Sequence, residues 1–264
     1  MAENTSKNSP IAYDDIGSGL PIVLIHGHPF NRSMWQPQLE ELRHNHRVIN
    51  FDLRGYGESH SAPAVKDFSD FAFDILDLLD HLNISSFVVM GLSMGGQIAL
   101  ETWYQAQERV IALVLADTFS GLDSLENKQL RYDTAERVLQ EGMKDYANEL
   151  LPRMIASETL ANKQTVAQHG YDMMCKTSPK GAAAALRSRA ERQDYTPYLK
   201  EISIPAQIIV GAEDVFTPVE DAKFMHSKIR SANCDVIDKA GHLPNLEQPE
   251  KFNAILKAFL TSLT

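Results

Sequence analysis

The feature that most constrains this chain is a run of strand-forming residues that stops at a serine flanked by glycines. The apolar residues Phe87 to Met90 are followed by Gly91-Leu92-Ser93-Met94-Gly95-Gly96 and then by a helix-like segment. In that context, Gly-x-Ser-x-Gly is typical of a tight strand-to-helix turn that pushes the serine hydroxyl out at the end of a parallel strand. The sequence therefore predicts Ser93 as a nucleophile.

A serine hydroxyl is a weak nucleophile at neutral pH, so it needs a base and a carboxylate that orients the base. Asp214 follows the strand-like run Ile208-Ile209-Val210, and His242 follows another short run, Cys234 to Asp238. The order Ser, Asp, His belongs to one fold and not to the chymotrypsin or subtilisin arrangement. We predict His242 as the base and Asp214 as its partner. Activity should then fall at acid pH, because protonation of the imidazole removes the base.

Five segments in this order make the chain resemble the α/β-hydrolase superfamily over almost its whole length. Three of them hold the serine, the aspartate and the histidine. The others each follow a strand signal, and they are His26-Gly27-His28-Pro29 and Asp52-Leu53-Arg54-Gly55-Tyr56-Gly57-Glu58-Ser59. The segments around His28, Ser93 and His242 look like the branch that contains carboxylesterases, 3-oxoadipate enol-lactonase-like enzymes and cofactor-free perhydrolases.

Two other carboxylates compete with Asp214 as the partner of the histidine. Consecutive side chains on an extended backbone point to opposite sides, so only one of Glu213 and Asp214 can face His242. Asp117 directly follows a strand-like run, at the place where some members of the superfamily carry the acid. The Gly-x-x-Asp spacing that ends at Asp214 resembles the commoner arrangement, and we expect Asp214 to act.

The resemblance also implies two backbone N–H donors for the oxyanion formed in acyl transfer. They belong to Met94, directly after the nucleophile, and to His28. Pro29 has no N–H and stiffens the same loop, which suits a preformed donor site. The His28 ring could also enter the pocket, but we expect it to be packed or to face solvent.

Strand-like runs alternate with segments of helical periodicity along most of the chain. This alternation predicts an α/β fold with a mostly parallel sheet covered by helices on both faces, and with the first strand as an antiparallel edge. The resemblance implies about eight strands. The runs in the sequence are Ile11–Ile16, Pro21–His26, Val48–Asp52, Phe87–Gly91, Val110–Ala116, Gln207–Gly211 and Cys234–Asp238.

The region from Thr118 to Leu199 contains no convincing strand and is rich in helix formers. By resemblance, residues 118–199 form a helical cap inserted after the sixth strand and folded over the serine, and residues 1–117 and 200–264 form the core domain. Methionine and aromatic residues at helical spacing more often pack in a core than line a pocket. The candidates of this kind in the cap are Met143, Met154, Met173, Met174, Tyr146 and Tyr171.

Composition excludes several classes of partner. The 264 residues carry 25 Lys and Arg against 35 Asp and Glu, and the net charge of −10 disfavours nucleic acid. No apolar stretch approaches the roughly 18 residues of a membrane helix. No signal sequence is apparent, Met1–Ser9 reads as a loose polar tail, and two cysteines are too few for a disulfide framework. We expect a soluble cytoplasmic protein of undetermined oligomeric state. Because metal-ligand spacings and nucleotide fingerprints are missing from the sequence, we expect no cofactor.

These observations predict an enzyme that cleaves a small or medium carboxylic ester or lactone through an acyl-enzyme. Haloalkane dehalogenases and epoxide hydrolases of the fold need a carboxylate where this chain has Ser93. Three alternatives stay open: a carbon–carbon bond hydrolase, a triad-bearing ligand receptor with little turnover, and an aminopeptidase. The aminopeptidase would need acidic cap residues to hold a substrate amine, for which the candidates are Glu141, Asp145, Glu149 and Asp172.

Overall fold

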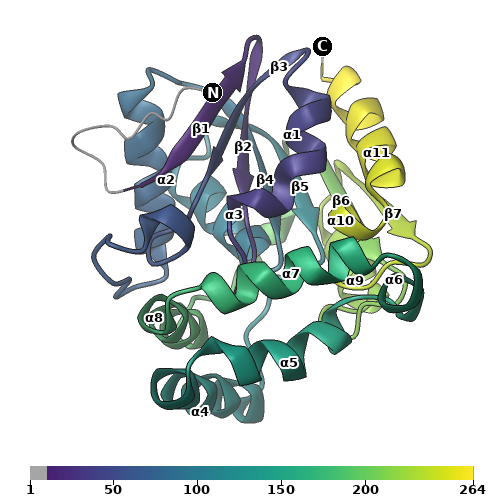
Figure 1. Ribbon diagram of the computed structural model, residues 1–264. Coiled ribbons are helices and arrows are strands. Elements are labelled where there is room, and N and C mark those ends of the chain that lie inside the picture. The colour runs from purple at the N-terminus through teal and green to yellow at the C-terminus, as the bar shows by residue number, and fades with distance from the viewer. Residues whose placement is uncertain (1–10, 264) are drawn as a thin grey trace.

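A seven-stranded sheet forms the centre of the computed structural model, which describes residues 11–263 (Figure 1). The segment Met1–Ser9, expected to be a loose tail, lies outside the described residues. The strand order is β1-β3-β2-β4-β5-β6-β7. The strands are β1 (Tyr13–Gly17), β2 (Leu20–Ile25), β3 (His46–Phe51), β4 (Phe87–Leu92), β5 (Val110–Ala116), β6 (Ala206–Gly211) and β7 (Ala232–Ile237).

The sheet confirms the predicted α/β class and its mostly parallel character. Only the pairing of β1 with β3 is antiparallel, and the other neighbouring strands of the described chain are parallel. Each of the seven strands coincides with one of the seven runs found in the sequence. The expected number of about eight was one too high for residues 11–263, because one strand, not two, precedes β2 in this part of the chain.

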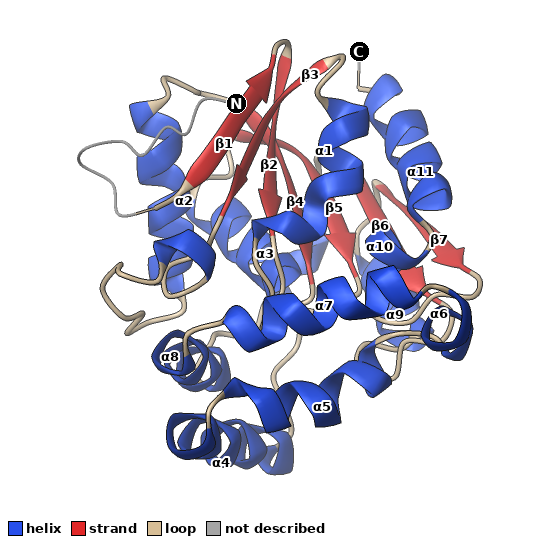
Figure 2. Cartoon of the chain, viewed as in Figure 1, coloured by secondary structure: helices blue, strands red, loops and turns tan. Residues whose placement is uncertain are grey.

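Helices cover both faces of the sheet (Figure 2). Alternate side chains of β2 enter opposite apolar layers: Val23 and Ile25 join one, and Ile22 and Leu24 join the other. This alternation follows from the two-residue period of a strand. The first layer packs against α2 (Ser69–His81), α3 (Met94–Gln105) and α9 (Val219–Lys228), and the second against α1 (Gln36–Leu42) and α11 (Pro249–Thr261).

A block of helices separates β5 from β6 in the chain and lies beyond the ends of the strands, at the bottom of the view in Figure 1. The helices are α4 (Leu125–Glu141), α5 (Met143–Met154), α6 (Ser157–Asn162), α7 (Gln164–Lys176) and α8 (Pro179–Ala190). The block follows the fifth strand of the described chain, not the sixth as expected, for the same reason that the sheet has one strand fewer.

Short helical turns complete the described chain. They are the 3-10 turns η1 (Arg32–Trp35), η2 (Gly57–Ser59) and η3 (Thr196–Glu201) and the single helical turn α10 (Pro244–Glu247). Among residues 11–263, no helix combines the length and the apolar character that crossing a bilayer requires.

Candidate active site

Ser93 lies at the junction of β4 and α3, in a backbone conformation that few L-residues adopt. Its φ is +57° and its ψ is −119°. The turn is tight: a Cβ on Gly91 would lie 2.0 Å from the Gly95 carbonyl oxygen, and a Cβ on Gly95 would lie 2.2 Å from that of Ile25. Only glycine fits at these two positions, which explains the Gly-x-Ser-x-Gly spacing. Strained residues of this kind cluster at functional sites, so the conformation itself marks Ser93.

Two backbone N–H groups beside the serine have no acceptor within the described chain. One belongs to Met94, the first residue of α3, where helix geometry leaves the N–H without an intrahelical partner. The other belongs to His28. The loop that carries His28 runs against the serine, since a Cβ on Gly27 would lie 3.3 Å from the Ser93 Cβ. The two donors expected from the resemblance are therefore both free to bind an anion, and the positive end of the α3 dipole favours one there.

Asp214 and His242 form a buried hydrogen-bonded pair. The Asp214 Oδ2 atom lies 2.7 Å from the His242 Nδ1 atom, whereas Glu213 is exposed. The backbone N–H groups of Phe216 and Thr217 donate to Asp214 Oδ1 at 2.8 and 3.2 Å, and the Thr217 hydroxyl donates to Oδ2. Burial opposes ionisation of Asp214, but the His242 ring and the Thr217 hydroxyl outweigh it, so the pKa of Asp214 falls to about 2. Asp214 is an anion at neutral pH.

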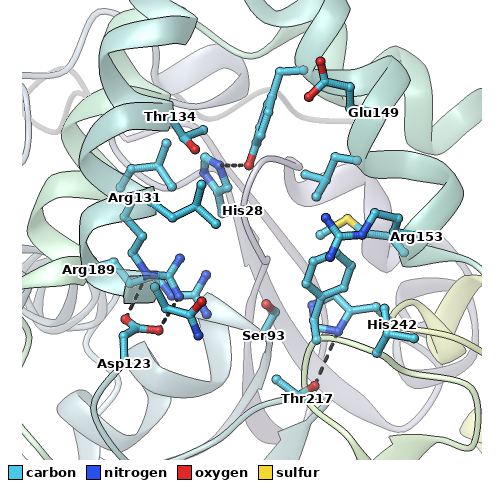
Figure 3. Close-up of a pocket in the computed structure, with 18 of the residues that line it drawn as sticks. His28, Ser93, Asp123, Arg131, Thr134, Glu149, Arg153, Arg189, Thr217 and His242 are labelled. Carbon is cyan, nitrogen blue, oxygen red and sulfur yellow. Dashed lines mark hydrogen bonds and ion pairs between the residues drawn. The ribbon is translucent and has the colours of Figure 1, made fainter. Parts of the chain in front are cut away.

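Ser93 and His242 line the same cavity, and in Figure 3 His242 lies to the right of the central Ser93. Within the described residues, no hydrogen bond joins the Ser93 hydroxyl to the ring. Catalytic hydrogen bonds are often long or poorly aligned before substrate binds. The structure thus brings the three predicted residues to one site and joins two of them directly.

Asp117, the competing acid, lies behind the pair rather than facing the cavity. Its Oδ1 atom accepts the Gly211 N–H at 2.9 Å, and its Oδ2 atom is buried without a partner in the described chain. Burial and the charge of Asp214 raise the pKa of Asp117 well above its ordinary value. Burial therefore favours the protonated form of Asp117, and Oδ2, which accepts no hydrogen bond, is the atom available for the proton.

Asp117, Asp214 and His242 are also the one group of His, Cys, Asp or Glu in residues 11–263 whose ligand atoms lie close enough to hold a metal ion, within 4.8 Å of one another. The Asp214 carboxylate already accepts hydrogen bonds from His242, Phe216 and Thr217. The group therefore fits an acid–base pair with an additional buried acid of raised pKa better than an ion site.

Glu247 fixes the loop that carries His242, a role that sequence reasoning missed. Its Oε1 atom accepts the N–H groups on both sides of the histidine, Gly241 at 2.8 Å and Leu243 at 3.2 Å. Its Oε2 atom accepts the Ala156 N–H at 2.7 Å and the Thr159 hydroxyl at 2.8 Å. Burial raises the pKa of Glu247 despite these donors. The only feature of the sequence that could have indicated this role was the position of the glutamate, five residues after His242.

The cavity has a volume of about 570 Å³ and lies between the sheet edge and helices α4, α5 and α8. Of the cap residues considered from the sequence, Tyr146 and Met154 line it. The other four pack in apolar clusters, as their helical spacing suggested. They are Met143, Met173, Met174 and Tyr171.

The His28 ring is buried, but it lines the cavity, which is the alternative that the sequence left open and not the one that we expected. It is 4% exposed, with Nδ1 2.7 Å from the Tyr56 hydroxyl and Nε2 3.3 Å from the Tyr146 hydroxyl. Burial, followed by the charge of Arg189, lowers the pKa of His28 well below its ordinary value. The ring is therefore neutral, and it joins the core of the molecule to α5.

The sequence and the fold agree with those of known proteins. The model of the alpha/beta hydrolase family matches residues 22–255. The chain is 33% identical to 3-oxoadipate enol-lactonase 1 of Acinetobacter baylyi, over 88% of this chain and 85% of the relative. Its fold is similar to that of a thermophilic esterase from Thermogutta terrifontis, with a TM-score of 0.94, 37% identity, and 99% and 98% of the two chains covered. It is also similar to the enol-lactonase of Burkholderia xenovorans, with a TM-score of 0.88, 26% identity, and 95% and 96% covered. The chain therefore belongs to the alpha/beta hydrolase family, and these similar proteins are esterases and enol-lactonases.

Proposed function

We propose that this protein hydrolyses small or medium carboxylic esters or lactones through an acyl-enzyme, with Ser93, His242 and Asp214 as its catalytic triad. His242 removes the hydroxyl proton as Ser93 Oγ attacks the carbonyl carbon, and the same proton then leaves with the alcohol. Water next attacks the acyl-enzyme in the same way and releases the acid. In a lactone, the alcohol stays attached to the acid as the opened ring.

The observation that carries this proposal is the Asp214–His242 hydrogen bond of 2.7 Å in the cavity that Ser93 faces. An ionised Asp214 holds the proton on His242 Nδ1, which leaves Nε2 free to act as the base. It also stabilises the imidazolium that forms during each step.

The free N–H groups of Met94 and His28 support an oxyanion hole. Negative charge appears on the carbonyl oxygen when Ser93 attacks, and preformed donors stabilise that charge without reorganising. Losing one donor of this kind typically costs about 2.7–4 kcal/mol of transition-state stabilisation. Residues 118–199 serve as the cap in this proposal, because α4, α5 and α8 supply the cavity wall that faces Ser93.

The similar proteins support ester or lactone chemistry. They include two enol-lactonases and an esterase whose structure holds malate. Each is similar over most of both chains, so the comparison includes the cavity region.

The decisive experiment measures turnover of p-nitrophenyl esters of increasing chain length and of several lactones. Multiple turnovers that disappear in Ser93→Ala are expected. A single burst that ends in a stable adduct would instead favour a ligand receptor. A fluorophosphonate should label the wild-type protein once, on Ser93, and labelling elsewhere would refute the nucleophile.

A further inference from the structure

Arg189 on α8 is a buried cation that lacks a counterion. It is 7% exposed and lines the cavity beside Ser93. Its Nε atom donates to the Gln97 Oε1 atom at 2.7 Å, which is a neutral partner. Among residues 11–263, no carboxylate lies within ion-pair distance of Arg189, and its two terminal nitrogens have no acceptor. Most of its donor capacity is therefore unused.

The nearest carboxylate already forms ion pairs with two neighbouring arginines. Asp123 pairs with Arg131 at 2.8 Å and with Arg192 at 2.7 Å. Arg131 also donates through Nε to the second oxygen of Asp123, at 2.9 Å. Two guanidinium groups thus occupy the one carboxylate nearest to Arg189, although the whole chain has a net charge of −10.

The other charged groups that line the cavity do not neutralise Arg189. Arg137 and Glu149 pair with each other at 2.8 Å. Asp133 is exposed and accepts from a glutamine on its own helix. Arg153 is exposed and lies over the Phe216 ring, 4.9 Å from its centroid. The buried wall therefore retains an excess of positive charge.

A buried charge without a partner is costly to the folded protein. Burial, followed by the charges of Arg131 and Arg192, lowers the pKa of Arg189. A guanidinium nevertheless remains protonated in proteins, because its ordinary pKa lies far above neutral pH. An anion that enters the cavity would therefore gain an interaction that the empty protein lacks.

We propose that Arg189 is the recognition site for a carboxylate on the substrate, so that the enzyme acts on esters or lactones that also carry a free carboxylate. This inference rests on the proposed function and adds its substrate class. A carboxylate matches the planar fork of a guanidinium, which binds it through two parallel N–H donors. Figure 3 shows Arg189 and His242 on opposite sides of Ser93, so a substrate held at Arg189 would extend across the nucleophile toward the base.

Two pairs of esters test this, each differing only in a carboxylate that replaces a methyl group. Monoethyl glutarate and ethyl pentanoate place the difference on the acyl side. β-Acetoxypropionate and propyl acetate place it on the alcohol side. In at least one pair, kcat/KM should favour the charged ester by about 10- to 100-fold, the range expected for hydrogen bonds to charged groups. Equal kcat/KM values in both pairs would overturn the proposal.

Three variants assign that preference. Arg189→Gln should abolish it by lowering kcat/KM for the charged esters to the level of the neutral ones. Gln97→Glu should also abolish the preference for charged esters although the arginine is kept, because the new carboxylate would form an ion pair with Arg189 inside the protein. This variant replaces Arg189→Gln in the test if Arg189→Gln fails to fold. Arg187→Gln is the matched control on the same helix, since Arg187 pairs with Glu136 at the surface and does not line the cavity. A preference that survives Arg189→Gln, or that is lost in Arg153→Gln instead, would overturn the assignment.

A binding measurement separates this inference from the proposed function. Calorimetric titration of Ser93→Ala with glutarate should show binding. When Arg189→Gln is added, this binding should weaken by the same factor as the kcat/KM preference for the charged ester. If glutarate binds through Arg189 but no ester is turned over, the subsite stands and the proposed function fails. If esters are hydrolysed but glutarate binds equally with and without Arg189, the subsite fails alone. Binding of inorganic phosphate without binding of glutarate would also refute a carboxylate site.

Discussion

Asp117 and Asp214 are two buried acids with ligand atoms within 4.8 Å of each other, and the pKa of Asp117 is raised while that of Asp214 is lowered. The two acids belong to the ends of adjacent strands, β5 and β6, which are parallel and end at the same edge of the sheet. Only one of them contacts His242. Their different surroundings shift their pKa values in opposite directions, and this separates their roles.

Asp117→Asn should make the protein progressively more stable than wild type as the pH rises from about 4. An unfolded aspartate ionises near pH 3.9, whereas folded Asp117 keeps its proton well above that value. The wild-type protein therefore loses stability as the pH rises through this window, by up to about 1.4 kcal/mol per pH unit, and an asparagine cannot ionise. Thermal unfolding of both proteins between pH 4 and 8 measures the difference. A difference that stays flat or shrinks would show that Asp117 is ionised in the folded state.

Asp214→Asn should reduce kcat on the order of ten-thousandfold, as removal of the charge does in the Ser-His-Asp template. The amide can no longer hold the His242 proton on Nδ1, so the base faces Ser93 in the wrong tautomer. Steady-state kinetics on a p-nitrophenyl ester measures the loss. The matched control is Glu213→Gln, which changes the exposed neighbour and should leave kcat unchanged. A large loss of kcat in Glu213→Gln with a small loss in Asp214→Asn would show that Glu213, not Asp214, is the partner of His242.

The sequence predicted the elements of the fold because each strand is specified by residues that are adjacent in the sequence. Strand β4, for example, is a short apolar run that ends directly before Ser93, and the serine turn follows from steric limits that Gly91 and Gly95 satisfy. The order of the segments then placed Ser93, Asp214 and His242 at one edge of a parallel sheet. These inferences need only the local residue pattern and the order of the catalytic segments in the superfamily that the sequence resembles.

The supporting residues could not be predicted, because their roles depend on contacts between distant segments. Arg189 and Gln97 are 92 residues apart in the chain, and Glu247 accepts from Ala156, 91 residues before it. Such contacts depend on how the block α4–α8 packs on the sheet. The orientation of the His28 ring has the same origin, since Tyr146 of α5 is one of its partners.

Glu247→Gln should lower kcat with little change in KM. Whichever oxygen becomes an amide nitrogen loses two donors, and each buried N–H left without an acceptor costs about 1–3 kcal/mol. The loop that positions His242 should therefore loosen, whereas the cavity wall that binds substrate lies mainly on other elements. Kinetics and thermal unfolding measure the two effects.

Glu250→Gln is the control for Glu247, because it changes an exposed glutamate in the first turn of α11. It should alter neither kcat nor the unfolding temperature. If Glu247→Gln lowers the unfolding temperature but leaves kcat intact, Glu247 stabilises the fold without positioning the histidine.

Gly95→Ala should destabilise the protein by at least about 1–3 kcal/mol, the usual cost of overpacking a tight interior. The new methyl group would lie 2.2 Å from the Ile25 carbonyl oxygen and 2.7 Å from that of His26, and both are backbone atoms that cannot rotate away. Relief requires α3 to move away from β2, which carries Ser93 away from the loop that holds the His28 N–H. We therefore expect fluorophosphonate labelling to slow together with the loss of stability. Gly121→Ala is the matched control, because its methyl group would meet only the Thr196 hydroxyl at 3.5 Å, an ordinary contact. If both variants unfold at the wild-type temperature, the serine turn is not packed too closely to accept a methyl group at Gly95.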